Sequence, residues 1–283
     1  MRATCALVFG LVLVSSSLAA QAGVPFSAVA DSARLAPAAE LRISYGSAAS
    51  QFAELRLPQG PGPHPVVFLL HGGCWLRAYG VDHVAGIAES LRRDGFAVFA
   101  AEYRRVGEEG AGAPGTFDDV RVAFDSLQAL APRHSLDAER VILMGHSAGG
   151  QLALWLASEP GLRPRAVIAL AAVTDLAAFA APSGCGSAVP RLMGAAPNPD
   201  DAEVAARYAA ASPALRAGPA EGTAVVLVTA EDDRTVPRAQ AEAYLARFPA
   251  ARELRVPGAH FDLVAPWTEA WARVLAALRG LVR

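Results

Sequence analysis

The sequence predicts an α/β fold in which a doubly wound, mostly parallel sheet is flanked by helices. Two observations carry this prediction. Short apolar runs alternate along the chain with longer amphipathic stretches, and the runs lack the polar–apolar alternation of a half-exposed strand. Such runs are typical of parallel strands that helices cover on both faces, and alternating strands and helices favour a doubly wound sheet.

The apolar and amphipathic segments define the expected elements one by one. Buried parallel strands are predicted at residues 66–70, 96–101, 141–144, 166–170 and 224–229. Residues 52–57 alternate, which indicates an antiparallel strand nearer the sheet edge. Helices are predicted at residues 84–93, 117–130, 148–158, 237–248 and 267–282. Thr116 and Asp119 resemble a capping box at the start of the second helix.

The longest stretch without a regular period covers residues 177–219 and is rich in proline, glycine and alanine. It lies between two predicted strands, near the end of the sheet where the active sites of doubly wound folds collect. We therefore expect a short irregular lid segment there, which shapes a substrate pocket.

The first residues resemble an export signal. Arg2 precedes an apolar run at 3–14, and small residues follow, ending in Ala20-Gln21-Ala22. The run is too short to span a bilayer, and the A-x-A pattern fits signal peptidase. We predict a signal peptide at residues 1–22, a single domain at 23–283, and a periplasmic or extracellular location. A retained anchor or a buried helix fits the order of charge, apolar run and small residues less well.

Composition limits the partners and the chemistry. With 53% hydrophobic residues the chain can bury a large core, and its net charge of −2 is scattered, which favours neither nucleic acid nor an anionic membrane surface. No later stretch is apolar enough for stable membrane insertion. Every basic residue is arginine, so lysine-based catalysis is excluded. Cys74 and Cys185 remain after the signal, and a disulfide and two free thiols both stay open. Their spacing gives no zinc-type signature.

The motif that carries chemistry is G-x-S-x-G at residues 145–149, directly after a predicted buried strand and directly before a predicted helix. That context is typical of a nucleophile elbow, a tight turn that presents one serine above the sheet. Gly145 and Gly149 avoid side-chain collisions in the turn, and Gly150 lets the helix pack closely. We predict that Ser147 is the nucleophile; a glycine-rich turn without chemistry is the alternative.

A serine hydroxyl needs a base, and the base needs an acid that holds its tautomer. In folds with this elbow the chain order is serine, acid, histidine, and only His260 follows Ser147. The acid is expected after the strand at 224–229, where we prefer Asp233 because D-x-x-V-P fixes it at the strand end. Asp232 is the nearest rival, and Asp175 is expected to be a loop residue or helix cap.

The residues His71-Gly72-Gly73-Cys74-Trp75 follow another predicted strand. Small residues there let backbone N–H groups approach a substrate oxygen, so Gly73 and Cys74, with Ala148 after the serine, form the predicted oxyanion hole. His71 is expected to brace its own loop. The Cys74 side chain is expected to pack, or to bridge to Cys185.

With HGGCW, the strand end Ala101-Glu102-Tyr103-Arg104, GHSAGG, D-x-x-V-P and HFD, the chain resembles the α/β-hydrolase superfamily over about residues 50–280. Within it, the chain resembles hormone-sensitive-lipase-like carboxylesterases, feruloyl-esterase-like proteins and kynurenine formamidases. HGG-x-W and HFD resemble the formamidases in particular. The resemblance implies acyl transfer through an acyl-enzyme, with no metal or organic cofactor. Cysteine in HGGCW and histidine in GHSAGG depart from the lipase-like pattern and blur the substrate.

Three functions compete on this sequence. The first is an exported hydrolase of short acyl or aryl esters, which export favours. The second is an arylformamidase that hydrolyses N-formylkynurenine, supported by HGG-x-W and HFD. The third is a catalytically silent fold used for binding, which a missing triad member would favour, and none is missing. The expected ligand is a small-molecule ester or amide, and the sequence does not specify the oligomeric state.

Overall fold

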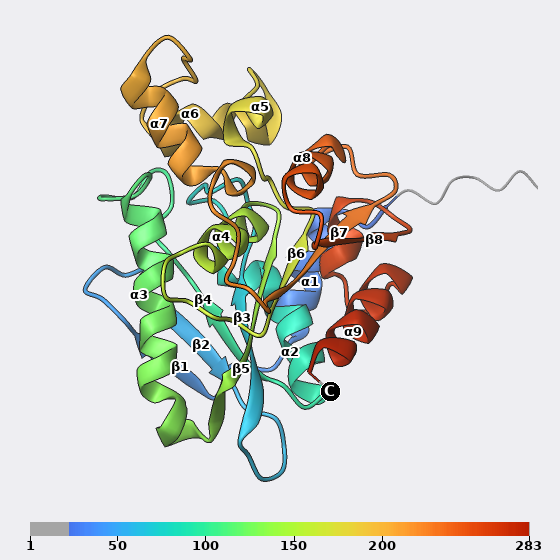
Figure 1. Cartoon of the computed structure of the whole chain (residues 1–283). Helices are drawn as coiled ribbons and strands as arrows, with labels where there is room; N and C mark the ends of the chain where they lie inside the picture. The colour runs from blue at the N-terminus through green and yellow to red at the C-terminus, as the bar shows by residue number, and fades with distance from the viewer. Residues whose placement is uncertain (1–22, 283) are drawn as a thin grey trace, which may run out of the picture.

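A computed structural model describes residues 23–282, which surround one eight-stranded sheet in the order β1-β2-β4-β3-β5-β6-β7-β8 (Figure 1). The predicted signal peptide lies outside the described residues. The strands are β1 Leu41–Ser44, β2 Phe52–Arg56, β3 His64–Leu70, β4 Ala97–Ala101, β5 Leu136–His146, β6 Ala166–Leu170, β7 Ala224–Ala230 and β8 Arg252–Val256. Each parallel strand ends at the same edge of the sheet, so the loops after β3, β5 and β7 meet there.

The predicted doubly wound sheet is confirmed. Strands β4, β3, β5, β6, β7 and β8 pair in parallel, and every residue of β4 and β6 is buried. The predicted strand at 52–57 is β2, which pairs antiparallel with β4. The edge itself is β1, a strand that was not predicted, which pairs with the other side of β2. β1 is short and mostly exposed, so it lacks an apolar run.

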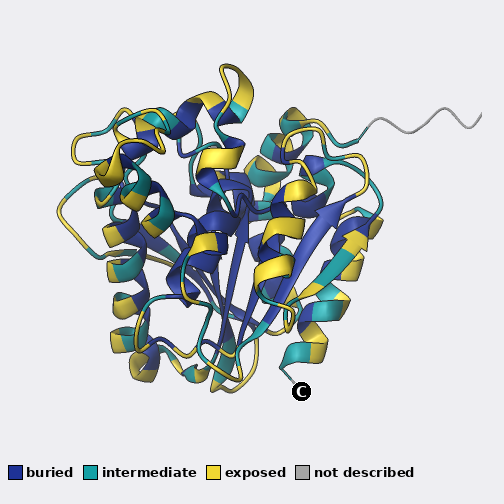
Figure 2. Ribbon diagram, turned by 45° about the horizontal axis from the view of Figure 1, so that its top comes forward, coloured by how far each residue is buried: buried dark blue, intermediate teal, exposed yellow. Residues whose placement is uncertain are grey.

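Helices cover both faces of the sheet. They are α1 Phe26–Leu35, α2 Ala85–Arg93, α3 Gly115–Leu130, α4 Ala148–Ala157, α8 Ala239–Arg247 and α9 Glu269–Leu281, together with the cap helices described below. Figure 1 shows α3 and α4 on one side of the sheet and α2 and α9 on the other. The buried strands and outward-facing exposed residues in Figure 2 follow from this layering. Five of these helices match the predicted ranges within two residues at each end, while α1 was not predicted.

The predicted capping box at the start of α3 is wrong. The helix begins at Gly115, and its N-cap Pro114 makes no side-chain cap. Thr116 instead donates its hydroxyl to Arg104 O at 2.6 Å, and Asp119 pairs with the Arg104 guanidinium at 2.7 Å. Tertiary partners therefore satisfy both side chains, which sequence spacing alone had assigned to the helix terminus.

The segment expected to be irregular, residues 177–219, contains helices. It holds α5 Leu176–Phe179 at its start, the 3-10 turn η3 Gly184–Ala188, α6 Val189–Met193, α7 Ala202–Ala211 and η4 Pro213–Leu215. Proline and glycine keep most of these helices short, which hid their period, and Asp201 caps α7 by accepting the N–H groups of Glu203 and Val204. We call this segment the cap; Figure 1 shows its helices beyond the ends of the central strands.

Within residues 23–282 no helix has the length and apolarity needed to cross a membrane.

Candidate active site

Ser147 occupies the turn between β5 and α4. Its backbone has φ 55° and ψ −116°, outside the helical and extended regions, and its N–H donates to Leu170 O at 2.7 Å. This left-handed φ is rare for a residue with a side chain and marks a turn held in strain by its surroundings. The turn has the conformation expected of a nucleophile elbow, with Ser147 at its tip.

The glycines of the motif are required by close backbone contacts. A Cβ at Gly145 would lie 2.1 Å from Gly149 O, and a Cβ at Gly149 would lie 2.3 Å from Leu70 O. A Cβ at Gly150 would lie 2.9 Å from the side chain of Ala172. Any larger residue would push α4 away from the sheet, so the sequence G-x-S-x-G-G is set by packing.

His260 and Asp233 come together from the loops that follow β8 and β7. His260 Nδ1 lies 2.8 Å from Asp233 Oδ2, and both side chains are almost fully buried. The other carboxylate oxygen accepts the N–H groups of Thr235 and Val236 at 2.8 and 3.0 Å. Burial raises the pKa of Asp233, but the bonds to His260 and to these two amides outweigh it and lower the pKa below its usual value. Asp233 is therefore an anion that orients the imidazole.

The rival acids lie elsewhere. Asp232 is exposed, and its backbone N–H donates to Gly258 O at 2.9 Å. Asp175 is the N-cap of α5, where its side chain accepts the N–H of Ala178. Among the three aspartates considered from sequence, the structure places only Asp233 against His260.

His146, the residue before the serine, joins the histidine to the elbow. Its Nε2 lies 3.0 Å from His260 O, and the two rings are 4.5 Å apart between centroids. A carbonyl only accepts, so His146 Nε2 carries the proton. Within residues 23–282, Ser147 Oγ makes no hydrogen bond to His260 and His260 Nε2 has no protein partner. Such contacts often form only when substrate binds.

The loop after β3 brings backbone N–H groups to the serine. Gly73 has φ 107°, and Cys74 and Trp75 have φ 55° and 56°, so the chain turns tightly at these residues. A Cβ on Gly72 would lie 3.2 Å from Ser147 Cβ. Within the described chain, the N–H groups of Gly73, Cys74 and Ala148 donate no hydrogen bond to protein. They remain available for a substrate oxygen.

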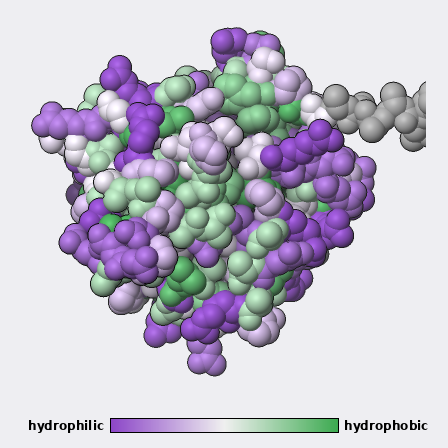
Figure 3. All heavy atoms as spheres, turned by 90° about the horizontal axis from the view of Figure 1, so that it is seen from above, coloured by the Kyte–Doolittle hydropathy of each residue, from purple (hydrophilic) through white to green (hydrophobic). Residues whose placement is uncertain are grey.

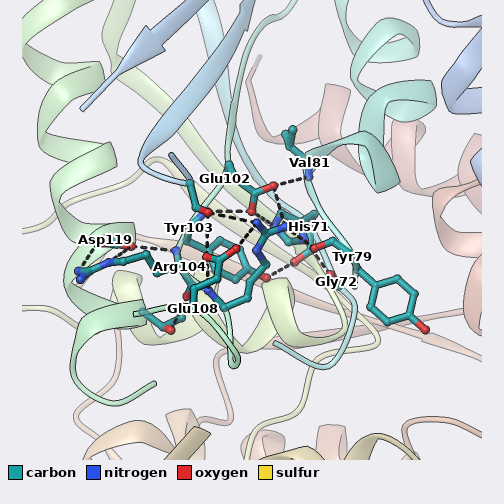
Figure 4. A network of polar contacts seen from close by, with 12 residues as sticks. His71, Gly72, Tyr79, Val81, Glu102, Tyr103, Arg104, Glu108 and Asp119 are labelled. Atoms are coloured by element: carbon teal, nitrogen blue, oxygen red, sulfur yellow. Dashed lines mark hydrogen bonds and ion pairs between the residues drawn. The ribbon is translucent and has the colours of Figure 1, made fainter. Parts of the chain in front are cut away.

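A buried ion-pair network holds this loop (Figure 4). His71 Nδ1 lies 2.7 Å from Gly72 O and its Nε2 lies 2.7 Å from Glu102 Oε1, while its ring stacks on Tyr103. Burial raises the pKa of Glu102, yet His71, Arg105 and the Tyr103 amide together lower it. The two ring nitrogens of His71 therefore each face an acceptor oxygen, Gly72 O and Glu102 Oε1, and these contacts hold the ring within its loop. Sequence reasoning missed Glu102, although an acid directly after a buried strand was a usable signal.

A disulfide between Cys74 and Cys185 ties the loop after β3, which we call the oxyanion loop after its predicted role, to the cap. The two Cα atoms are 5.2 Å apart, and 111 residues separate the cysteines in the sequence. Cys185 lies in η3, so the disulfide joins the loop after β3 to a segment that follows α4 in the sequence.

No group of three or more histidine, cysteine, aspartate or glutamate side chains within residues 23–282 is arranged to hold a metal ion.

The fold and the elbow define an α/β-hydrolase. The BD-FAE family model matches residues 54–248, which is more than half of the chain, and the protein belongs to this family. The match starts in β2 and ends after α8, so it includes the elbow, the oxyanion loop, the cap and Asp233. His260 lies beyond it.

Comparison with known proteins gives similar folds at low identity. Esterase B from Lactobacillus rhamnosis HN001 is 20% identical with a TM-score of 0.72, and the alignment covers 90% of each chain. The bifunctional GH43-CE protein of Bacteroides eggerthii is 20% identical with a TM-score of 0.70, over 86% of this chain and 35% of that one. The non-reducing polyketide synthase ausA of Aspergillus calidoustus is 34% identical over 122 residues, 39% of this chain. The chain spans only about 5% of that synthase's length.

Proposed function

We propose that the protein is an exported carboxylic ester hydrolase that cleaves short acyl or aryl esters through an acyl-enzyme. The observation that carries this proposal is the buried His260–Asp233 pair, whose imidazole lies against the residue preceding Ser147. Membership of the BD-FAE family and the likeness to esterase B support the same chemistry.

We infer one role for each residue of the site. Ser147 Oγ attacks the ester carbonyl while His260 Nε2 accepts its proton, and Asp233 keeps the proton on Nδ1. The oxyanion of the tetrahedral intermediate receives the N–H groups of Gly73, Cys74 and Ala148. His260 then protonates the departing alcohol, leaving the acyl group on Ser147. Water, activated by the same imidazole, releases the acid and restores the serine.

Two observations support export. The sequence pattern of residues 1–22 is that of a signal peptide, and the Cys74–Cys185 disulfide is a bond that persists in oxidising compartments. A periplasmic or extracellular enzyme meets esters from outside the cell. Figure 3 shows apolar residues gathered in the middle of the face that carries the cap, within a hydrophilic rim, which suits an apolar acyl or aryl group.

The test compares kcat/KM for p-nitrophenyl acetate and N-formylkynurenine on one preparation of the mature protein. Ser147→Ala is the matched variant, and we expect it to lower turnover by up to the order of 10⁶, as loss of a serine nucleophile can. Turnover by Ser147→Ala close to that of the parent would contradict the mechanism.

The second substrate decides between two related activities. Two features favour an arylformamidase. One is HGG-x-W, in which the buried Trp75 donates its Nε1–H to Gln151 Oε1 at 3.0 Å, and the other is Phe261, whose ring packs beside that of His260. A kcat/KM for N-formylkynurenine that exceeds the ester value by orders of magnitude would replace the esterase proposal with a formamidase. Absence of turnover on both, with no difference on Ser147→Ala, would favour a binding role.

A further inference from the structure

The segment that precedes the catalytic domain's sheet contacts both sides of the proposed site. Phe26, the first residue of α1, lies 5.2 Å from the ring of Tyr79 and 5.5 Å from the ring of Phe261 between centroids. A Cβ on Gly73 would lie 2.3 Å from Tyr79 Cβ, so Tyr79 packs on the oxyanion loop. Phe261 is next to His260 in sequence. We call residues 23–35 the N-terminal arm.

Asp262 fixes the arm to the loop of the catalytic histidine. Its Oδ2 accepts the N–H of Val24 at 2.9 Å and the N–H of Ala259 at 3.0 Å. Ala259 immediately precedes His260, so one carboxylate oxygen joins the start of the arm to the base. This oxygen lacks a cationic partner among the described side chains, since its two bonds come from neutral amides.

Gly23 lies directly against this carboxylate. A Cβ at Gly23 would be 2.9 Å from Asp262 Oδ2 and only 2.3 Å from the Ala259 side chain. The contact therefore requires glycine. The nitrogen of Gly23 is one bond, about 1.5 Å, from the Cα to which that Cβ would be attached, so an amine there lies near the carboxylate.

The surroundings of Gly23 are acidic. Asp232 from the loop after β7 and Glu269 from the first turn of α9 line the same open cleft as Gly23 and Asp262. None of the described residues that line this cleft is an arginine or a histidine. Glu269 has a partner, Arg273, on its own helix. The cleft suits one compact cation.

We propose that signal-peptide removal creates that cation, and that the α-ammonium of Gly23 pairs with Asp262 and completes the bracing of the His260 loop. This inference rests on the proposed function and on the predicted cleavage after Ala22. Hydrolysis of the Ala22–Gly23 bond consumes one water and leaves a carboxylate on Ala22 and an amine on Gly23. The amine binds a proton near neutral pH, where an α-amino group has an ordinary pKa of about 7.7–8.0. Asp262 is thus a positioning residue, acting through Ala259.

Because the sequence contains no lysine, the α-amine of the mature chain can be modified without modifying any side-chain amine. Reductive methylation with ¹³C-formaldehyde labels that amine alone and keeps its charge. Acetylation of the same amine removes its charge. The two modified forms are a matched pair that separates charge from steric bulk.

The first measurement is an NMR titration of the ¹³C-methylated N-terminus, after intact mass has established Gly23 as the first residue. We expect the pKa of this amine to be about half a unit or more above that of the same methylated amine on a peptide of residues 23–28. Asp262→Asn should return it to the peptide value, whereas Asp31→Asn, which removes an exposed acid from the same arm, should not. A peptide-like pKa in the parent protein, or a first residue other than Gly23, overturns the proposal.

The second measurement is ester hydrolysis between pH 7 and pH 10. At pH 7 the methylated form should have the kcat of the unmodified enzyme, and the kcat of the acetylated form should be about three- to fivefold lower. KM should change little, since neither modification alters the acyl site. The methylated form should lose the same factor as pH rises through the pKa of the amine, and the acetylated form should not. Equal kcat in both forms overturns the inference while leaving the esterase intact. No Ser147-dependent hydrolysis in either form indicates instead that the proposed function is wrong, and the NMR titration still decides the ion pair.

Discussion

Two buried histidines in this protein contact buried carboxylates at nearly the same distance, yet they differ in what their second ring nitrogen contacts. His71 lies 2.7 Å from Glu102 and His260 lies 2.8 Å from Asp233. His71 uses its second nitrogen on Gly72 O. His260 Nε2 has no partner within the described chain and lies beside the serine turn. In the proposed mechanism, the ring nitrogen without a partner, rather than the histidine–carboxylate pair itself, distinguishes the base from the structural histidine.

The two pairs also differ in what surrounds the carboxylate. Glu102 accepts the N–H groups of Val81 and Tyr103 and binds Arg105, so it anchors the loop after β3, which carries the predicted oxyanion donors. Among residues 23–282, the partners of the Asp233 carboxylate are the two turn amides and the imidazole. The first pair stabilises backbone geometry, and the second fixes a tautomer.

The largest expected effect is on the His260 side. Asp233→Asn should lower kcat by about 10⁴-fold, the magnitude seen when this acid is replaced in a serine protease, because the amide favours the wrong tautomer. Its urea midpoint should change far less than its kcat. Asp232→Asn is the control and should retain activity. If the Asp233→Asn enzyme kept a kcat near that of the parent, the proposed catalytic role of the His260–Asp233 pair would be contradicted.

On the His71 side the expected effect is first on stability. Glu102→Gln removes one charge from a buried pair and should lower the free energy of unfolding by about 3–5 kcal/mol. Urea unfolding at pH 7 measures this, with the exposed Glu109→Gln as control. Full stability together with a large loss of kcat would mean that Glu102 acts in the reaction rather than in the loop.

The smallest expected effect concerns a third buried histidine that has no carboxylate. Neither nitrogen of His83 has a hydrogen-bond partner among the described residues, and burial, with His71 and His260 nearby, lowers the pKa of His83 to about 3. The folded protein thus resists protonation, while the unfolded chain binds a proton below about 6.5. Stability from this group is complete above pH 6.5 and is lost as pH falls toward 3.

The variant His83→Leu removes that dependence. Between pH 7 and pH 5 its loss of unfolding free energy should be smaller than the parent's by about 2 kcal/mol. Urea midpoints at the two pH values give the comparison. Identical acid sensitivity in parent and variant would show that His83 finds a partner when protonated.

Local pattern was sufficient for the strands and for the elbow. Buried parallel strands appear as continuous apolar runs because both faces are covered, and the structure confirms those runs as β3 to β7. The glycines around Ser147 were interpreted from the motif alone, and the structure agrees, because a Cβ at Gly145 or Gly149 would lie 2.1 or 2.3 Å from a backbone oxygen. By contrast, β1 and β8 carry exposed residues and lack that signal.

The sequence by itself determined the five buried parallel strands, the serine turn and the chain order that leaves His260 as the one candidate base. They follow from features that can be read along the chain itself: continuous apolar runs, the steric demands of a tight turn, and the order of residues. Tertiary structure placed Asp233, which the sequence favoured, rather than its rivals against His260. It alone decided that Glu102 holds His71 and that the arm at Gly23 reaches Asp262, 239 positions away. Those contacts join loops distant in sequence, and a charged residue carries no local mark of the partner that folding brings to it.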